Sequence, residues 1–214
     1  MGKLAEPMRV SRLRRLVLAE NVFMRLLPRE AHRGSTRFGR MGDVVQQPPV
    51  WAGMAALLAV VGGTRGRRAA VRGSVCYGVT AILANLVVKP VVGRKRPPGA
   101  GEGRTGPVTS SFPSGHSATD LAFALGVTQE IPALFFPLAV ATSAGHWSLV
   151  RSRGHYPSDV FVGGALGVAV ALVAWKACPP PARGAEEADS TPPGHPEVVD
   201  QRRTPPPRRR RLPC

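Results

Sequence analysis

The stretch Ser111-Phe112-Pro113-Ser114-Gly115-His116 lies between an Arg-rich, Gly/Pro-rich loop and a long apolar run. Pro113 suits the first turn of a helix, because the N–H that proline lacks would have no partner there. Ser114 and Gly115 offer a small hydroxyl and backbone N–H groups to an anion, and His116 adds an imidazole. The stretch therefore predicts the N-terminus of a helix that faces a polar pocket, although an ordinary helix cap can use the same residue types.

Apolar segments precede and follow this stretch. They cover roughly residues 50–63, 74–92, 117–127, 131–150 and 158–178, and the second, fourth and fifth approach the ~20 residues that cross a bilayer. Gly and Ala are frequent in them, which favours close helix packing in lipid. Arg and Lys lie between the segments, unlike the basic faces of a soluble nucleic-acid-binding protein. We therefore expect an all-α, polytopic membrane helical bundle with about five apolar helices.

The two ends of the chain differ from this central part. Residues 1–48 are rich in Arg, and their apolar side chains fall on one broad helical face. This pattern is typical of an amphipathic helix at a membrane surface, or of a soluble helix packed on a core, and residues 34–49 look like a linker. Residues 179–214 are Pro-rich and charged without apolar periodicity, which predicts a disordered tail. The predicted membrane-embedded domain therefore covers residues 49–178.

Composition indicates the kind of partner. The formal net charge of +16 and the pI near 11.5 point to nucleic acid, an acidic membrane surface or a phosphorylated substrate. The three cysteines, Cys76, Cys178 and Cys214, are far apart and indicate neither a disulfide framework nor a zinc site. The Arg-rich start of the chain carries no pattern of a secretory signal, which is compatible with an uncleaved membrane protein. With the apolar segments, the charge favours the membrane and phosphorylated lipid as partners, and no nucleic acid.

Polar residues form three clusters at the ends of apolar segments. The first runs from Lys89 to Arg96-Pro97, the second is Pro113 to His116, and the third runs from His155 to Asp159. Polar side chains are costly at membrane depth and commonly mark a functional site. If the segments alternate in direction, the end of the second segment and the starts of the third and fifth emerge on the same side. One pocket can then gather all three clusters.

In this order the three clusters resemble the signature of the type 2 phosphatidic acid phosphatase and vanadium haloperoxidase superfamily. The resemblance covers about residues 50–177. It implies a helical bundle that hydrolyses phosphomonoesters without a metal, through a phosphohistidine. The small size resembles that of the membrane lipid phosphate phosphatases, which act on a polyprenyl-linked phosphate, a polyprenyl diphosphate or phosphatidic acid. The resemblance also suggests an extracytoplasmic site. The excess of Ala, Gly, Arg and Pro is compatible with a bacterial sequence, so we expect a bacterial plasma membrane, whereas the oligomeric state stays open.

Four residues have the chemistry needed to bind a phosphoryl group. Lys89 and Arg96 supply fixed positive charge, and Arg96 can make a bidentate contact. Ser114 and the N–H of Gly115 supply neutral donors. Taken singly, Lys89 could be a residue that snorkels from a helix end, and Arg96 could be a charge set by membrane topology.

Three further residues have the chemistry of the catalytic groups. We expect His155 to attack phosphorus and Asp159 to hold its imidazole in the required tautomer. We expect His116 to protonate the leaving oxygen and later to activate water. No Asp/Glu cluster suited to Mg²⁺ accompanies them, so the sequence predicts neither a metal nor a cofactor. Taken singly, Asp159 could cap a helix, and His155 could be a surface histidine. A further histidine, His146, matches no position of the motifs.

The third cluster departs from the family pattern at one position. The family carries a Ser-Arg pair before its histidine, and here those positions are Ser148 and Leu149. A phosphate-binding arginine is therefore missing, and Arg153 or Arg151 of the same loop is a candidate to replace it. The alternative is a catalytically weakened or inactive member that binds phosphorylated lipid or a protein partner.

Overall fold

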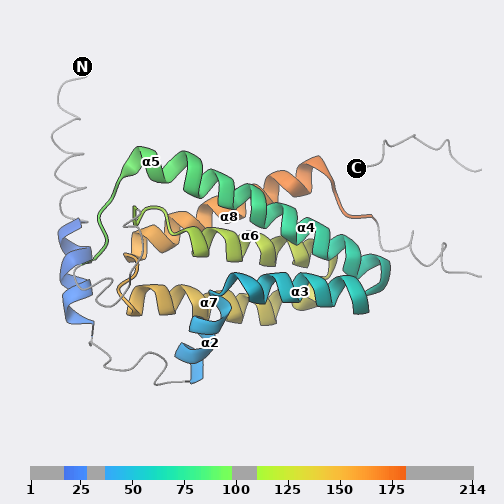
Figure 1. Ribbon diagram of the computed structural model, residues 1–214, viewed down its shortest axis with the longest axis horizontal. Helices are drawn as coiled ribbons and strands as arrows, with labels where there is room; N and C mark the ends of the chain where they lie inside the picture. The colour runs from blue at the N-terminus through green and yellow to red at the C-terminus, as the bar shows by residue number, and fades with distance from the viewer. Residues whose placement is uncertain (1–16, 28–36, 98–109, 182–214) are drawn as a thin grey trace, which may run out of the picture.

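The computed structural model describes residues 17–27, 37–97 and 110–181, and every regular element in these ranges is helical (Figure 1). The expected all-α membrane bundle is therefore confirmed. Most of the tail predicted over residues 179–214 lies outside the described residues, as does the start of the N-terminal amphipathic helix.

Within the described residues, three helical segments are long and apolar enough to cross a membrane: Gly63–Val92, Pro132–Arg151 and Pro157–Ala177. The first joins α4 (Gly63–Ile82), the π-helical turn η1 (Leu83–Val88) and α5 (Lys89–Val92). The second joins the short turn η2 (Pro132–Leu134) to α7 (Phe135–Arg151), and the third is α8 (Pro157–Ala177). The helices α2 (Arg37–Val45) and α3 (Pro48–Val61) meet at 79°. If this bent pair forms a single membrane span, it is the fourth. The chain is an integral membrane protein.

The central helix is α6 (Gly115–Glu130), which packs against α4, α7 and α8 (Figure 1). Its Phe123 and Val127 are buried in the core, where the Phe123 ring lies 5.2 Å from that of Trp51. Because neighbouring helices cover α6 on several sides, it is mostly buried although it is shorter than the three spans. The short third apolar segment of the sequence is thus an interior helix.

Glycines let the helices approach α6 closely. A Cβ added at Gly126 would lie 3.0 Å from the Cα of Gly73 on α4. On α8, a Cβ at Gly163 or Gly167 would overlap the carbonyl oxygens of Ser114 and Ala118. The start of α8 is therefore held directly against the start of α6, as the Gly-rich sequence predicts for helices packed in lipid.

The linker predicted over residues 34–49 is wrong for residues 37–45, which form α2. Gly42 packs against the backbone of Ala144 on α7, and the Ser148 hydroxyl donates a hydrogen bond to the Asp43 carboxylate. Glycine-rich sequence has low helix propensity, but here the small residues allow a close helix contact whose packing stabilises the helix.

The basic connection expected between the first two apolar segments is instead the first part of α4. Arg72 and Arg68 donate from Nε to the Glu130 carboxylate at 2.8 and 3.3 Å, and Arg65 Nε donates to the Glu130 carbonyl at 2.6 Å. Glu130 is buried at the end of α6. A buried carboxylate needs such partners, and this cluster ties α6 to α4 at the end of the bundle remote from Gly115.

Residues 17–27, called the N-terminal segment below, are helical from residue 17 to residue 26. Met24 is buried against Val150 and Tyr156, whereas Val22 and Leu26 on other faces are exposed. The segment therefore packs on the bundle and also presents apolar side chains outward, whereas its position at a membrane surface stays a prediction.

Candidate active site

The start of α6 has the capping geometry predicted for it. Ser114 is the N-cap, and its Oγ accepts hydrogen bonds from the N–H of Ser117 at 3.3 Å and from the Ser117 hydroxyl at 2.9 Å. Pro113 precedes the cap instead of lying in the first turn. The N–H of Ser114 donates to the carbonyl of Asp159 at 2.9 Å, so the second and third motif clusters are in direct contact.

The first motif cluster lies against the same helix start. Lys89 Nζ donates to Asn85 Oδ1 at 2.6 Å and lies 3.3 Å from the position that a Cβ on Gly115 would occupy. Glycine at position 115 therefore leaves room for the ammonium group beside the N-terminus of α6. Arg96 donates from a terminal guanidinium nitrogen to the carbonyl of Gly154 at 2.9 Å, directly before the third cluster's histidine. Both cations lie at the same end of the bundle, where an anion can bind.

The imidazole of His155 is buried and held by a backbone carbonyl. Its Nδ1 lies 2.7 Å from the carbonyl oxygen of Ser111, and 3.7 Å from Asp159 Oδ2. A carbonyl can only accept, so in the neutral ring Nδ1 carries the proton and Nε2 carries the lone pair. Ser111 is itself anchored, because its N–H donates to the Arg94 carbonyl at 2.8 Å and its hydroxyl to the Lys95 carbonyl at 3.1 Å.

The carboxylate of Asp159 is fully buried and makes two hydrogen bonds. Oδ2 accepts from the N–H of Tyr156 at 2.9 Å, which caps α8, and Oδ1 accepts from Arg94 at 2.8 Å. Arg94 also donates to the Ser158 hydroxyl at 2.7 Å. The capping role is thus present, whereas orientation of His155 by Asp159 stays a prediction, because the Ser111 carbonyl is nearer to the ring nitrogen.

The N-terminal segment reaches the same group of residues. Glu20 accepts from Arg94 at 2.8 Å and from the N–H of Ser158 at 2.8 Å. The Arg94 guanidinium lies 4.1 Å from the centre of the Tyr156 ring, and the Tyr156 hydroxyl donates to Asn21 Oδ1 at 3.1 Å. Burial raises the pKa of the Tyr156 phenol, so the hydroxyl stays protonated at neutral pH and can donate. Arg94 is therefore shared between the candidate active site and the N-terminal segment.

Ser111, Arg94 and Glu20 were not among the predicted site residues, although Ser111 lies in the stretch before α6 and Arg94 lies in the first cluster. Ser111 acts through a backbone carbonyl, which every residue type has, so its role leaves no sequence signal. Arg94 belongs to the first basic cluster. It differs from its neighbours only in that its guanidinium contacts Asp159 and Glu20, which the sequence does not show. Glu20 is an acidic residue in a basic segment, which was the available signal for an ion pair.

Removing the carboxylate of Glu20 is expected to loosen this region. In Glu20→Ala the Arg94 guanidinium and the Ser158 N–H each lose an acceptor, and we expect the free energy of unfolding to fall by about 1–2 kcal/mol, because the pair is partly exposed to solvent. The measurement is thermal unfolding in detergent micelles. The matched control is Arg25→Ala, which removes an exposed charge from the same helix. Equal midpoints for the two variants would contradict the prediction.

Other predicted residues lie around the edge of the site. His116 is exposed on the first turn of α6. Arg153 has φ of 56° and donates from its guanidinium to the carbonyl of Leu27 at 3.1 Å, so it contacts the N-terminal segment. Arg151 is partly buried, and Leu149, at the position of the missing arginine, is buried. Binding of phosphate by Arg153 stays a prediction. Among the described residues, no three His, Cys, Asp or Glu side chains gather as in a metal site.

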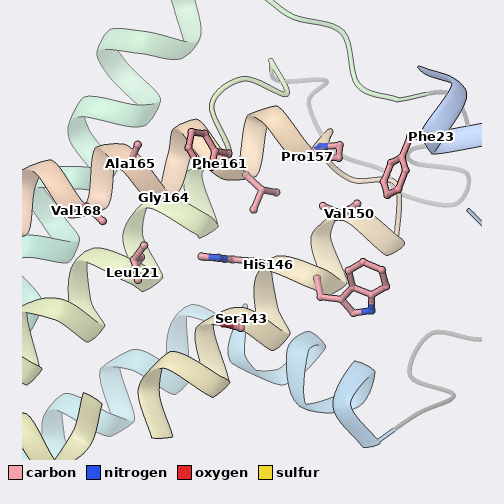
Figure 2. Close-up of a pocket in the computed structure, with 12 residues that line it drawn as sticks. Phe23, Leu121, Ser143, His146, Val150, Pro157, Phe161, Gly164, Ala165 and Val168 are labelled. Carbon is pink, nitrogen blue, oxygen red and sulfur yellow. The ribbon is translucent and has the colours of Figure 1, made fainter. Parts of the chain in front are cut away.

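An apolar pocket of about 780 Å³ adjoins the site between α7 and α8, with α6 as its floor. Val150 and Pro157, which flank the loop that carries His155, line one end of it, together with Phe23 of the N-terminal segment. Figure 2 shows His146 reaching from α7 across the pocket towards α6. Its Nε2 is buried and has no hydrogen-bond partner among the described residues.

The chain belongs to the PAP2 superfamily, whose family model matches residues 73–180 and so includes all three motif clusters. Among solved structures, it is similar to the first transmembrane PAP2 type phosphatidylglycerolphosphate phosphatase from Bacillus subtilis. The two share 19% sequence identity with a TM-score of 0.44, and the match covers 80% of this chain and 96% of the other. No curated protein matches the chain.

Proposed function

We propose that this protein is a membrane lipid phosphate phosphatase that hydrolyses a phosphomonoester through a phosphohistidine at His155. The observation that carries the proposal is the direct contact between the three motif clusters at one end of the bundle. Lys89 lies beside Gly115, and the N–H of Ser114 donates to the carbonyl of Asp159. Membership of the PAP2 superfamily supports the same class of reaction.

Phosphate binding in this proposal uses the cations and the helix start. Lys89 and Arg96 neutralise the phosphoryl oxygens, and the N–H groups of the first turn of α6, including that of Gly115, donate to them. These donors are held in place before substrate arrives, because Lys89 bonds to Asn85, Arg96 bonds to the Gly154 carbonyl, and α6 packs on α8. Fixed donors stabilise the charge that develops on the oxygens in the transition state.

The chemistry takes two steps. Nε2 of His155 attacks phosphorus while the bond to the ester oxygen breaks, and His116 gives its proton to the leaving alkoxide. His116 then removes a proton from water, whose oxygen attacks phosphorus and displaces His155 Nε2. Inorganic phosphate leaves with both histidines restored. The Ser111 carbonyl and the nearby Asp159 carboxylate stabilise the positive charge that the ring carries while it is phosphorylated.

The apolar pocket beside the site supports a lipid as the carrier of the phosphate. It begins at Val150 and Pro157 next to the His155 loop and lies between two helices that are long enough to span the membrane. A polyprenyl-linked phosphate, a polyprenyl diphosphate or phosphatidic acid would each place a phosphate at the site and a chain in the pocket. The resemblance further suggests that this end of the bundle lies outside the cytoplasm, and the composition is compatible with a bacterial plasma membrane.

The buried Leu149 favours a second candidate function. An arginine of the family pattern is absent at this position, and Arg153 contacts the Leu27 carbonyl. Such a chain could bind a phosphorylated lipid or a protein partner with little or no turnover. In the first proposal Arg153 supplies the missing contact when substrate is bound.

The test is release of inorganic phosphate from a panel of lipid phosphates by detergent-purified protein in EDTA. Release that persists in EDTA is expected, because no step described above uses a metal ion. Folded wild-type protein that binds these lipids but releases no phosphate would favour the second candidate.

Replacing Lys89 by glutamine is expected to lower phosphate release about ten- to a hundredfold, since a hydrogen bond to a charged group contributes about 1.5–3 kcal/mol. The matched control is Lys95→Gln, which removes an exposed lysine from the loop that follows α5. Equal losses in both variants would show that general positive charge, and not contact by Lys89, accounts for the effect.

A further inference from the structure

The N-terminal segment lies at the end of the bundle where the His155 loop meets the start of α8 (Figure 1). The residues of the segment that contact this region include Glu20, Asn21, Met24 and Leu27. The segment lies outside residues 73–180, which the family model matches. Its contacts with the candidate active site are therefore a feature of this chain that the matched family region does not contain.

Within the segment, the carboxylate of Glu20 binds two groups at once. Oε1 accepts a hydrogen bond from the N–H of Ser158 at 2.8 Å, and Oε2 accepts one from Arg94 at 2.8 Å. The Glu20 and Arg94 side chains are 18% and 22% exposed, so solvent screens their charges less than those of a surface pair. Glu20 therefore joins Arg94 to the first turn of α8, the turn that carries Asp159.

The guanidinium of Arg94 lies between two carboxylates. One terminal nitrogen donates to Glu20, and the other donates to Asp159 Oδ1 at 2.8 Å and to the Ser158 hydroxyl at 2.7 Å. The Cζ atom of Arg94 lies 4.1 Å from the centre of the Tyr156 ring. Both terminal nitrogens are thus occupied by groups of the protein, which indicates that Arg94 orients other side chains instead of binding substrate.

The charges of these three groups leave one negative charge beside His155, because Arg94 contributes one positive charge and each carboxylate one negative charge. Asp159 Oδ2 lies 3.7 Å from Nδ1 of His155. In the proposed reaction, Nε2 bonds to phosphorus as the ester oxygen leaves with a proton from His116. Nδ1 keeps its proton, so the ring is positively charged until water takes its place on phosphorus. Without Glu20, Arg94 would offset the charge of Asp159, and the ring would lose a stabilising negative neighbour.

We propose that Glu20 is a positioning residue for the phosphorylation of His155. Its carboxylate offsets the charge of Arg94 and holds the guanidinium against the first turn of α8. The negative charge of Asp159 then remains available to the phosphorylated ring. This inference rests on the proposed function and extends its machinery into the N-terminal segment. Glu20 touches no substrate in this scheme and acts through Arg94.

Glu20→Gln tests the charge with little change in shape. We expect kcat for phosphate release from the best lipid phosphate of the panel to fall about tenfold, which corresponds to about 1.4 kcal/mol, whereas KM stays within about twofold of the wild-type value. Glu20→Asp keeps the charge and is expected to recover part of the lost kcat. The matched control is Arg25→Gln, which removes an exposed charge from the same helix and is expected to behave as wild type.

The rate of acid-labile labelling by radioactive p-nitrophenyl phosphate reports the phosphorylation step itself. It is measured in the His116→Ala background, where hydrolysis of the phosphoenzyme is expected to be slow. Glu20→Gln is expected to lower this rate about tenfold, and to have little further effect when Arg94 is also replaced by glutamine, because Glu20 acts through Arg94. Losses that multiply in the combined variant would overturn the inference.

Thermal unfolding in the same detergent shows that each variant is folded. Wild-type kcat in folded Glu20→Gln protein, or equal losses in Glu20→Gln and Glu20→Asp, would overturn the inference and leave the phosphatase proposal intact. Folded wild-type protein that releases no phosphate would overturn the phosphatase proposal. Thermal stabilisation by orthovanadate, an analogue of the phosphoryl group, then decides. A smaller shift in Glu20→Gln than in Arg25→Gln would still support positioning of the site by Glu20, and equal shifts would overturn it.

Discussion

The His155→Ala variant is expected to release no phosphate above background from any lipid phosphate, a loss of about 10⁴-fold or more, as for removal of other enzymatic nucleophiles. Nε2 of His155 is the atom proposed to attack phosphorus, because Nδ1 is engaged by the Ser111 carbonyl at 2.7 Å. Alanine leaves no group that can form the covalent intermediate. The measurement is phosphate release, with thermal unfolding in the same detergent to show that the variant is folded.

His116→Ala provides the comparison that separates a nucleophile from an acid. A substrate with a good leaving group, such as p-nitrophenyl phosphate, needs little protonation, so His116→Ala should still form the phosphoenzyme from it and then hydrolyse it slowly. Acid-labile labelling by radioactive phosphate is therefore expected in His116→Ala and absent in His155→Ala. Label that persists in folded His155→Ala protein would assign the nucleophile to another residue.

Gly163→Ala is expected to lower both stability and activity. A Cβ at this position would overlap the carbonyl oxygen of Ser114, a backbone atom at the N-cap of α6. Relief of the overlap requires α8 to move away from α6, which strains the hydrogen bond from the Ser114 N–H to the Asp159 carbonyl. We expect a loss of about 1–3 kcal/mol in the free energy of unfolding, the usual cost of overpacking, together with reduced phosphate release.

Gly78→Ala is the matched control for this variant. Gly78 lies on α4, and a Cβ there would meet no atom within 4 Å. Alanine is preferred over glycine in helices by about 0.8–1.0 kcal/mol, so this variant should be as stable as wild type or slightly more stable. Unfolding midpoints in detergent distinguish the two cases. Similar midpoints for Gly163→Ala and Gly78→Ala would mean that the α6–α8 contact is not tightly packed.

Much of the architecture could be read from the chain because membrane helices have strong sequence signals. The second, fourth and fifth apolar segments approach the length of a span. The structure lengthens the second to Gly63–Val92 and shifts the other two by one residue, to Pro132–Arg151 and Pro157–Ala177. Alternating direction was enough to predict that Lys89, Ser114 and His155 lie at the same end. These conclusions depend on local hydropathy and on chain connectivity, which the sequence contains directly.

Other features depend on contacts between distant residues. Residues 37–45 form a helix because Gly42 packs against α7, although their composition is typical of a linker. The arginines from Arg65 to Arg72 lie on a helix because Glu130, far along the chain, is buried beside them. Local propensity cannot predict either outcome, since in both cases tertiary packing supplies the stabilising partner.

By itself, the sequence determined the membrane bundle, the family resemblance and the set of side chains proposed to bind and cleave a phosphate ester, because each is recorded in residue types and their spacing. The tertiary structure decided how they are held. It engages Nδ1 of His155 with the backbone carbonyl of Ser111, and it joins Asp159 to Glu20 through Arg94. It also leaves apolar pockets between α8 and the neighbouring helices. Carbonyl directions, shared ion pairs and gaps between helices arise only when distant segments pack, so no local pattern records them.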